Sequence, residues 1–300
     1  AIDNVNKDLE PARNLKWEAS IDFSVHGNRF SATIFREDLT SGFRSMTYYA
    51  PYSYKVYNAS NITNKQVEQG LRLDELNYEN VTELFGRSYT GNGSRTLKKG
   101  LEYTFSTRRF KGINTRLTIN GAWFITTYQN SQSVMERAKT VVNERQVGYA
   151  ALYKDNDKVK HEMANTNFTF DTDVPRLKLG FSISAQCLWF TSSQKQPLSL
   201  VPDAYMKPDG QVVNWKEGDE KNALLRWVVR DYTPSYFKKD VTPFSANVNF
   251  KVTKKLLKDK VNVAMFCNKL WDYTPDYKDE DLIIRRHVNP YFGLEINVKL

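Results

Sequence analysis

The chain has 300 residues, of which 40% are hydrophobic and 13% aromatic, so its composition is that of a folded protein and not of a disordered one. No run of about 18 apolar residues occurs, which excludes a transmembrane helix. Strands that cross a membrane are not excluded, because only alternate residues of such a strand face lipid. The formal net charge of +9 makes nucleic acid a candidate partner.

The positions of the basic residues argue against nucleic acid. They gather at short turns between alternating segments, where they suit the ends of hairpins near lipid headgroups, and no recognition motif accompanies them. The clusters are Arg108, Arg109 and Lys111, then Arg176 and Lys178, and then Lys254, Lys255, Lys258 and Lys260. We therefore expect no nucleic-acid partner.

The first predicted element is a β-hairpin. From Trp17 to Val25, apolar residues alternate with polar ones, which places the apolar side chains on one face of a strand. Gly27 and Asn28 then indicate a tight turn, and the alternation resumes at Phe30.

Three further hairpins have the same pattern, and one more strand follows them. The paired segments are 101–106 with 115–125, 168–174 with 177–189, and 244–252 with 261–267, and the last strand is 292–300. Together they make about nine strands, most of them close to or longer than the roughly 9 to 11 residues that cross a bilayer at a tilt. The predicted fold class is all-β and antiparallel.

The connections between the predicted strands alternate between tight turns and long segments. The long ones are 39–95, 131–163, 191–242 and 269–289. A soluble sandwich gives no reason for this asymmetry, whereas outer-membrane barrels have short periplasmic turns and long extracellular loops. We therefore predict a transmembrane β-barrel segment whose last strand ends at the periplasmic face.

An odd number of strands does not close as a bacterial up-and-down barrel, which has an even number. An open sheet in lipid would also leave unpaired backbone groups along its edges. We expect the missing strands upstream of Ala1, so that residues 1–300 form the carboxy-terminal part of a larger barrel.

Three stretches resemble the barrel of SusC-type, TonB-dependent receptors. The segment from Asn6 to Arg13 is similar to the family's N-x-D-L-K-P-E-R segment, which precedes a barrel strand. The segment from Asn268 to Pro275 is similar to its N-N-L-F-D-Y-x-P segment, and Pro290 to Glu295 resembles the start of its last strand. The three stretches occur in the family's order and span nearly the whole chain.

This resemblance implies a protein of the cell outer membrane that imports a nutrient, an oligosaccharide or a peptide. It also implies a SusD-like lipoprotein over the extracellular mouth, outer-membrane lipid around the wall, and TonB acting through a plug domain that is absent from these 300 residues. Polar wall residues would then face the plug or the lumen. Examples are Glu18, Asp22, Glu102 and Arg116.

No residue pattern indicates catalysis, a metal site or another cofactor, so we do not expect an enzyme. His26, His161 and His287 have no metal-ligand spacing to another histidine or to a cysteine. The acidic group Asp276 to Asp281 lacks the signature of a calcium loop, and we interpret it as a solvated loop, with Asp155 to Asp157 weaker still.

The ligand-binding candidates come from the long segment 197–236, where aromatic residues stand among polar ones. Aromatic faces stack on sugar rings and on peptides, so we predict ligand contacts for this group. The aromatic residues are Tyr205, Trp215, Trp227, Tyr232 and Tyr236, and the predicted ligand contacts among them are Trp215, Trp227, Tyr232 and Tyr236. The alternative is that these rings pack the long loop against its neighbours.

Two other groups of aromatic residues occur outside this segment. The tyrosine-rich stretch from Tyr48 to Tyr57 is open to both of the interpretations above, and its evenly spaced members could extend a strand above the membrane. Trp123 and Trp189, predicted to face lipid, suit an aromatic girdle.

Two other functions remain open from the sequence alone. One is an adhesin or structural barrel without transport, which the sequence upstream of the chain would distinguish. The other is a soluble β-rich protein that binds carbohydrate, which membrane extraction would distinguish.

Overall fold

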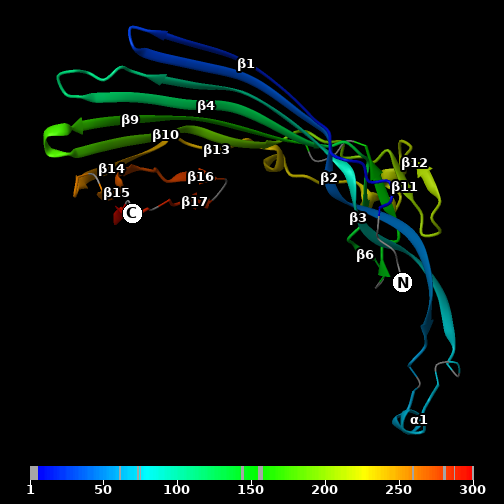
Figure 1. Ribbon diagram of the computed structural model, residues 1–300. Helices are drawn as coiled ribbons and strands as arrows, with labels where there is room; N and C mark the ends of the chain where they lie inside the picture. Colours follow the sequence, from blue (N-terminus) through cyan, green and yellow to red (C-terminus); the bar gives the residue numbers. More distant parts are fainter. Residues whose placement is uncertain are drawn as a thin grey trace.

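The computed structural model describes residues 6–60, 62–72, 74, 76–142, 145–154, 158–258, 260–279, 282–286 and 288–298. Within them the chain is all-β and antiparallel, and its largest unit is a curved sheet that stays open (Figure 1). Some residues of the sequence predictions lie outside the described residues. They are Ala1, Asp155, Asn156, Asp157, Glu280, Asp281, His287 and Leu300.

Nine strands follow one another along this sheet in chain order, each antiparallel to the next. They are β1 (Asn14–Val25), β2 (Asn28–Tyr57), β3 (Tyr78–Ser106), β4 (Thr115–Asn130), β9 (Val159–Val174), β10 (Leu179–Lys195), β14 (Ser245–Leu256), β15 (Val261–Tyr273) and β18 (Tyr291–Val298). A short tenth strand, β13 (Asp240–Thr242), also pairs with β10. The predicted hairpins and their order are confirmed.

The short turns lie together at one end of the sheet, on the left in Figure 1, and the long connections lie at the other. The first turn consists of His26 and Gly27, whose φ angles of 48° and 80° are those of a type I′ hairpin turn. The sequence pointed to Gly27 and Asn28, one residue too late, because Asn28 pairs with Val25 as the first residue of β2.

The segment 39–95 was predicted as a loop, and this prediction was wrong. β2 and β3 remain paired as far as Tyr57 and Tyr78, so they form a long arm that leaves the sheet, with the short helix α1 (Asn64–Glu68) at its tip (Figure 1). Cross-strand aromatic pairs such as Tyr57 with Tyr78, whose ring centroids are 5.8 Å apart, favour the extended pairing. The strand extension considered for Tyr48 to Tyr57 is confirmed.

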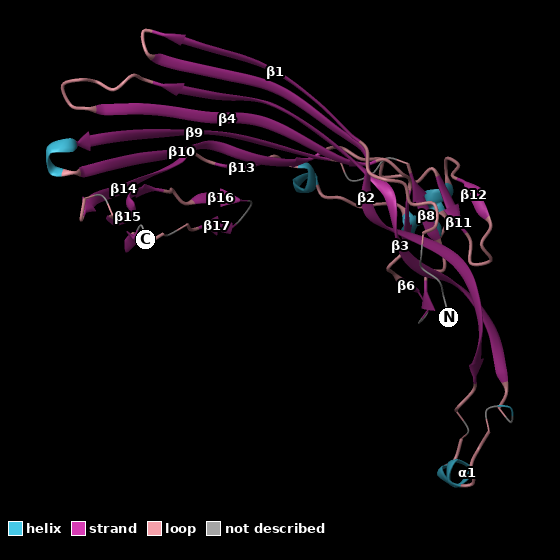
Figure 2. Cartoon of the chain, viewed as in Figure 1, coloured by secondary structure: helices cyan, strands magenta, loops and turns pink. Residues whose placement is uncertain are grey.

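The connections 131–163 and 191–242 come together in a second, small sheet. Its strand order is β12 (Val212–Asn214), β11 (Ala204–Met206), β8 (Ala150–Tyr153) and β5 (Val134–Arg137). Single turns of 3-10 helix follow in the second connection, η3 (Asp219–Lys221), η4 (Leu225–Val228) and η5 (Pro234–Phe237), and Figure 2 shows how little helix the chain contains. Two further two-stranded pieces are β6 (Val141–Val142) with β7 (Arg145–Gln146) and β16 (Tyr277–Asp279) with β17 (Leu282–Ile284).

The two buried hydrophobic clusters of the described residues gather around the small sheet, and only the arm of β3 contributes a buried residue to them from the large sheet. One cluster consists of Ala138, Val147, Ala151, Tyr153 and Val228. The other consists of Leu84, Ala150 and Met206, so the arm is fastened to the small sheet through a side chain that is only 1% exposed. No helix among the described residues is long and apolar enough to cross a membrane.

Candidate functional site

The large sheet has two faces of opposite polarity, and the strand register defines them. One row of cross-strand neighbours is Phe23, Phe30, Phe105, Ile119, Phe168, Ala185, Val248 and Trp271. The next row is Asp22, Ser31, Thr104, Asn120, Asn167, Gln186, Asn247 and Asp272. Because side chains alternate across a strand, the two rows lie on opposite faces, which we call the apolar face and the polar face.

The large side chains of the apolar face are open to their surroundings. Ile21, Met265 and Phe292 are 59%, 55% and 71% exposed, and neither buried cluster includes a side chain of the two rows given above. Soluble monomeric proteins rarely leave an apolar surface of this size exposed. Where one occurs, it marks a site that contacts another protein or a membrane. The described residues therefore contain an apolar surface without a core of their own to cover it.

The polar face carries the wall residues that the sequence singled out. Glu18, Asp22, Glu102 and Arg116 all have the register of this face. Hydroxyl and amide groups also interact there across strands, for example Ser20 with Thr33 at 2.9 Å. The face can thus border water.

The two predicted girdle tryptophans are both partly exposed, Trp123 at 44% and Trp189 at 48%. Trp123 lies on the apolar face beside Leu101, and its indole N–H donates to Glu162 at 3.1 Å. The indole N–H of Trp189 donates to Thr166 at 2.8 Å, next to a register shift in β10. An apolar ring with one polar contact suits the border between lipid and water.

Among the four predicted ligand contacts, the structure brings Tyr232 and Tyr236 together. Their rings stack with centroids 4.2 Å apart and an angle of 11° between the planes. The Lys195 ammonium lies 3.6 Å from the Tyr236 ring centroid, close enough for a cation–π interaction. Phe237 meets both tyrosine rings edge-on.

Tyr236 also borders a small cavity at the long-connection end of the sheet, with a volume of about 230 Å³. Its lining comes from four separate segments and consists of Tyr128, Lys158, Val159, Lys195, Leu198 and Tyr236. Tyrosine rings and a lysine beside a cavity can stack on a sugar or peptide and attract a negatively charged group. Nothing in the sequence indicated Tyr128 or Lys195, because the pairing of β4, β9 and β10 brings these two residues together and η5 places Tyr236 beside them.

Trp215 and Trp227 lie elsewhere. Trp215 packs on the buried cluster of the small sheet and meets Tyr205 edge-on at 6.1 Å, which is the packing alternative considered above. Trp227 is 40% exposed and has the Arg226 guanidinium 4.7 Å from its ring. Neither residue lines the cavity beside Tyr236.

A buried arginine holds the aromatic loop in place. Arg230, whose side chain is 5% exposed, donates through Nε to Glu136 at 3.2 Å and lies 3.6 Å from the Tyr153 ring centroid. The Tyr153 hydroxyl donates to the Val228 carbonyl. Burial raises the pKa of both Tyr153 and Tyr232 above the ordinary tyrosine value, so both hydroxyls stay protonated at neutral pH.

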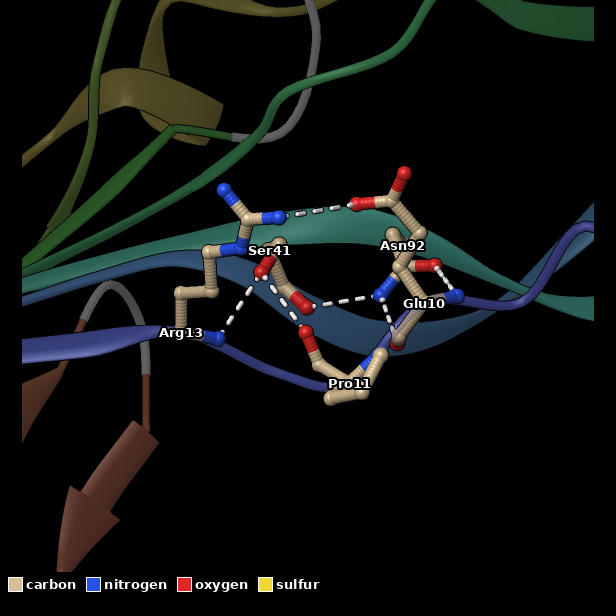
Figure 3. Close-up of polar contacts among 5 residues, drawn as sticks. All are labelled: Glu10, Pro11, Arg13, Ser41 and Asn92. Carbon is tan, nitrogen blue, oxygen red and sulfur yellow. Dashed lines mark hydrogen bonds and ion pairs between the residues drawn. The ribbon is translucent and has the colours of Figure 1, made fainter.

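The segment Asn6–Arg13, which carries part of the family resemblance, is fastened across β2 and β3 (Figure 3). The Asn92 side chain accepts from the Glu10 amide at 2.9 Å and donates to the Glu10 carbonyl at 2.8 Å and to the Ser41 carbonyl at 2.9 Å. Ser41 in turn accepts from the Arg13 amide at 2.9 Å. These bonds set where the chain enters β1.

Among the described residues, no group of three or more His, Cys, Asp or Glu side chains could hold a metal ion. Comparisons of the chain with models of protein families, with curated proteins and with solved structures give no match. The functional interpretation therefore depends on the two faces of the sheet, the aromatic cavity and the sequence resemblance.

Proposed function

We propose that this chain is a wall segment of an outer-membrane β-barrel that imports a nutrient. The observation that carries the proposal is the exposed apolar face, which extends over all nine strands and is backed by a face of polar side chains. In lipid the first face would be covered by acyl chains, while the second would border an aqueous lumen.

The height of the apolar face agrees with this proposal. On β4 it runs from Leu117 to Ile125, which at about 3.3 Å per residue is roughly 26 Å along the strand. At the usual strand tilt of about 40° this corresponds to roughly 20 Å across the membrane, near the apolar band of about 25 Å of outer-membrane barrels.

The open edges of the sheet support a larger barrel. β1 and β18 each pair on one side only within the described residues. In lipid the free backbone groups along these edges would be strongly destabilising, so further strands must pair with them. On this proposal the short turns are periplasmic, and the arm and the small sheet are extracellular.

Transport is supported by the resemblance to SusC-type receptors and by the position of the aromatic cavity at the long-connection end. The stacked Tyr232 and Tyr236 would contact an oligosaccharide or peptide at the mouth, and the polar face would let it pass beside a plug that TonB moves. A SusD-like lipoprotein would close the mouth from outside. The chain itself would perform no catalysis and need no cofactor.

The first test is membrane extraction of the full-length protein from a Gram-negative host. We expect it to stay with the membrane fraction in alkaline carbonate and to dissolve only in detergent. Recovery in the aqueous fraction would contradict the barrel and favour a soluble carbohydrate-binding protein.

The second test is uptake. A strain without the gene should lose growth on at least one oligosaccharide or peptide and regain it with the wild-type gene. A protein that stays in the membrane while uptake of every nutrient is unchanged would instead be an adhesin or structural barrel.

A further inference from the structure

The apolar face becomes cationic toward the long connections. Beyond Trp123, on β4 and the strands beside it, six basic side chains either have the register of this face or lie beside residues that have it. These are Arg36, Arg95, Lys99, Lys158, Lys160 and Lys239. Among the described residues, two acidic side chains, Asp38 and Glu162, lie with them.

The two carboxylates are already paired. Asp38 accepts two hydrogen bonds from Arg95, at 3.1 and 2.8 Å. Glu162 lies 3.8 Å from the Lys160 ammonium and 3.9 Å from the Lys239 ammonium.

Positive charge is therefore left over. Lys99 is exposed and forms no ion pair within the part of the chain that the structure describes. Only two of the five N–H donors of Arg95 are used by Asp38. This surface is suited to an additional anion.

A hollow lies at the centre of this basic surface. It has a volume of about 230 Å³ and lies where β3 and β4 pair, in the register of the apolar face. Its lining consists of Arg95, Leu97, Thr127, Gln129 and Lys158. It thus combines a guanidinium, an ammonium, a hydroxyl and an amide, all able to donate to phosphate oxygens, with one apolar side chain.

We propose that this hollow binds the phosphate-bearing headgroup of an anionic lipid in the outer leaflet. The inference rests on the proposed membrane location, since only there does lipid cover the apolar face. Thr127 follows Trp123 by about 13 Å along the strand, or about 10 Å across the membrane at the usual tilt, which places the hollow at headgroup level above the apolar band. Acyl chains below the headgroup would then contact Leu101 and Trp123.

The test is a binding titration of the full-length protein in a neutral detergent with dioctanoyl phosphatidic acid. Dioctanoyl phosphatidylcholine and inorganic phosphate are the comparison probes. We expect phosphatidic acid to bind more tightly than both, and Lys99→Gln and Lys158→Gln each to weaken its binding about fivefold. The matched control is Lys98→Gln, which removes the same charge from the next residue of β3 on the polar face and should leave this affinity unchanged.

Three outcomes would overturn the proposal. Equal affinity for phosphatidylcholine would mean that only the acyl chains bind, and equal affinity for inorganic phosphate would mean a site for free anions. An equal loss in the Lys98→Gln and Lys99→Gln variants would mean a charge effect without a site. A protein that resists carbonate extraction but shows any of these results keeps its proposed membrane location, so the two proposals can fail separately.

Discussion

Ile183 and Ser184 are neighbours in β10 whose side chains leave the sheet on opposite faces. Ile183 pairs with Phe170 and Phe250 midway along the apolar face and is 44% exposed, whereas Ser184 pairs with Thr169 and Asn249 on the polar face. A charge at the bilayer midplane on the lipid side of a barrel costs about 2–4 kcal/mol.

We therefore expect Ile183→Arg to lower the free energy of unfolding by about 2–4 kcal/mol in lipid vesicles, and Ser184→Arg to change it far less. Equilibrium unfolding in urea measures both, and Val248→Arg with Asn247→Arg is a second matched pair on β14. Equal effects on the two faces would refute the assignment of lipid and lumen.

The stacked tyrosines allow a second prediction at this scale. Tyr236→Ala removes one ring of the stack and the partner of the Lys195 ammonium, so it should weaken ligand binding by about 0.5–1.5 kcal/mol. Trp227→Ala changes an exposed ring away from the cavity and should have little effect. Calorimetric titration with the oligosaccharide or peptide whose uptake needs the protein measures the affinity of both variants. A larger loss of affinity in Trp227→Ala would place the binding site at Trp227 and not at the cavity.

At the scale of elements, the arm formed by β2 and β3 divides into two parts. Near the sheet it is fastened to the small sheet, where Leu84 packs with Ala150 and Met206 and the Arg137 guanidinium donates to the Leu84 carbonyl at 2.8 Å. Farther out, the pair of Ser53 and Thr82 and the pairs beyond it contribute no side chain to either buried cluster.

Replacing residues 54–81 by Asn-Gly, which closes a two-residue hairpin turn, should thus change the free energy of unfolding by less than about 1 kcal/mol. Leu84→Ala should lower it by about 2–5 kcal/mol, because it opens a cavity in a fully buried cluster. Urea unfolding of the two variants in detergent micelles gives the comparison. If the shortened arm were the less stable of the two, the outer part of the arm would hold a structural contact.

At the scale of the whole molecule, the two edges of the sheet decide whether it closes. The backbone N–H groups of β1 point alternately toward β2 and away from it. Those that point away have no strand to bond within the described residues. In the full-length protein we expect further strands to occupy this edge.

Hydrogen exchange of the full-length protein in detergent micelles tests this expectation. All amides between Asn14 and Val25 should be protected, as in the interior strand β4. Fast exchange at every second amide of β1 would show a free edge and would contradict closure into a barrel.

The sequence by itself determined the nine strands of the large sheet between the short turns and the long connections, their antiparallel order and which face of each is apolar. Alternation has a period of two, so residues such as Ile21 and Asp22 report their faces without any knowledge of their neighbours. The tight turns were also predictable to within a residue, as His26 and Gly27 show, because turns need particular backbone angles.

Only the tertiary structure decided what the long connections do. β5, β8 and β11 are too short for a periodic signal, and they form a sheet because segments far apart in the chain supply each other's hydrogen bonds and buried side chains. The same holds for Tyr236 of η5 beside Lys195 of β10 and for Arg95 of β3 beside Lys158, which come from segments far apart in the chain. Local patterns define which way a side chain points, but its neighbours depend on the strand pairing of the whole sheet.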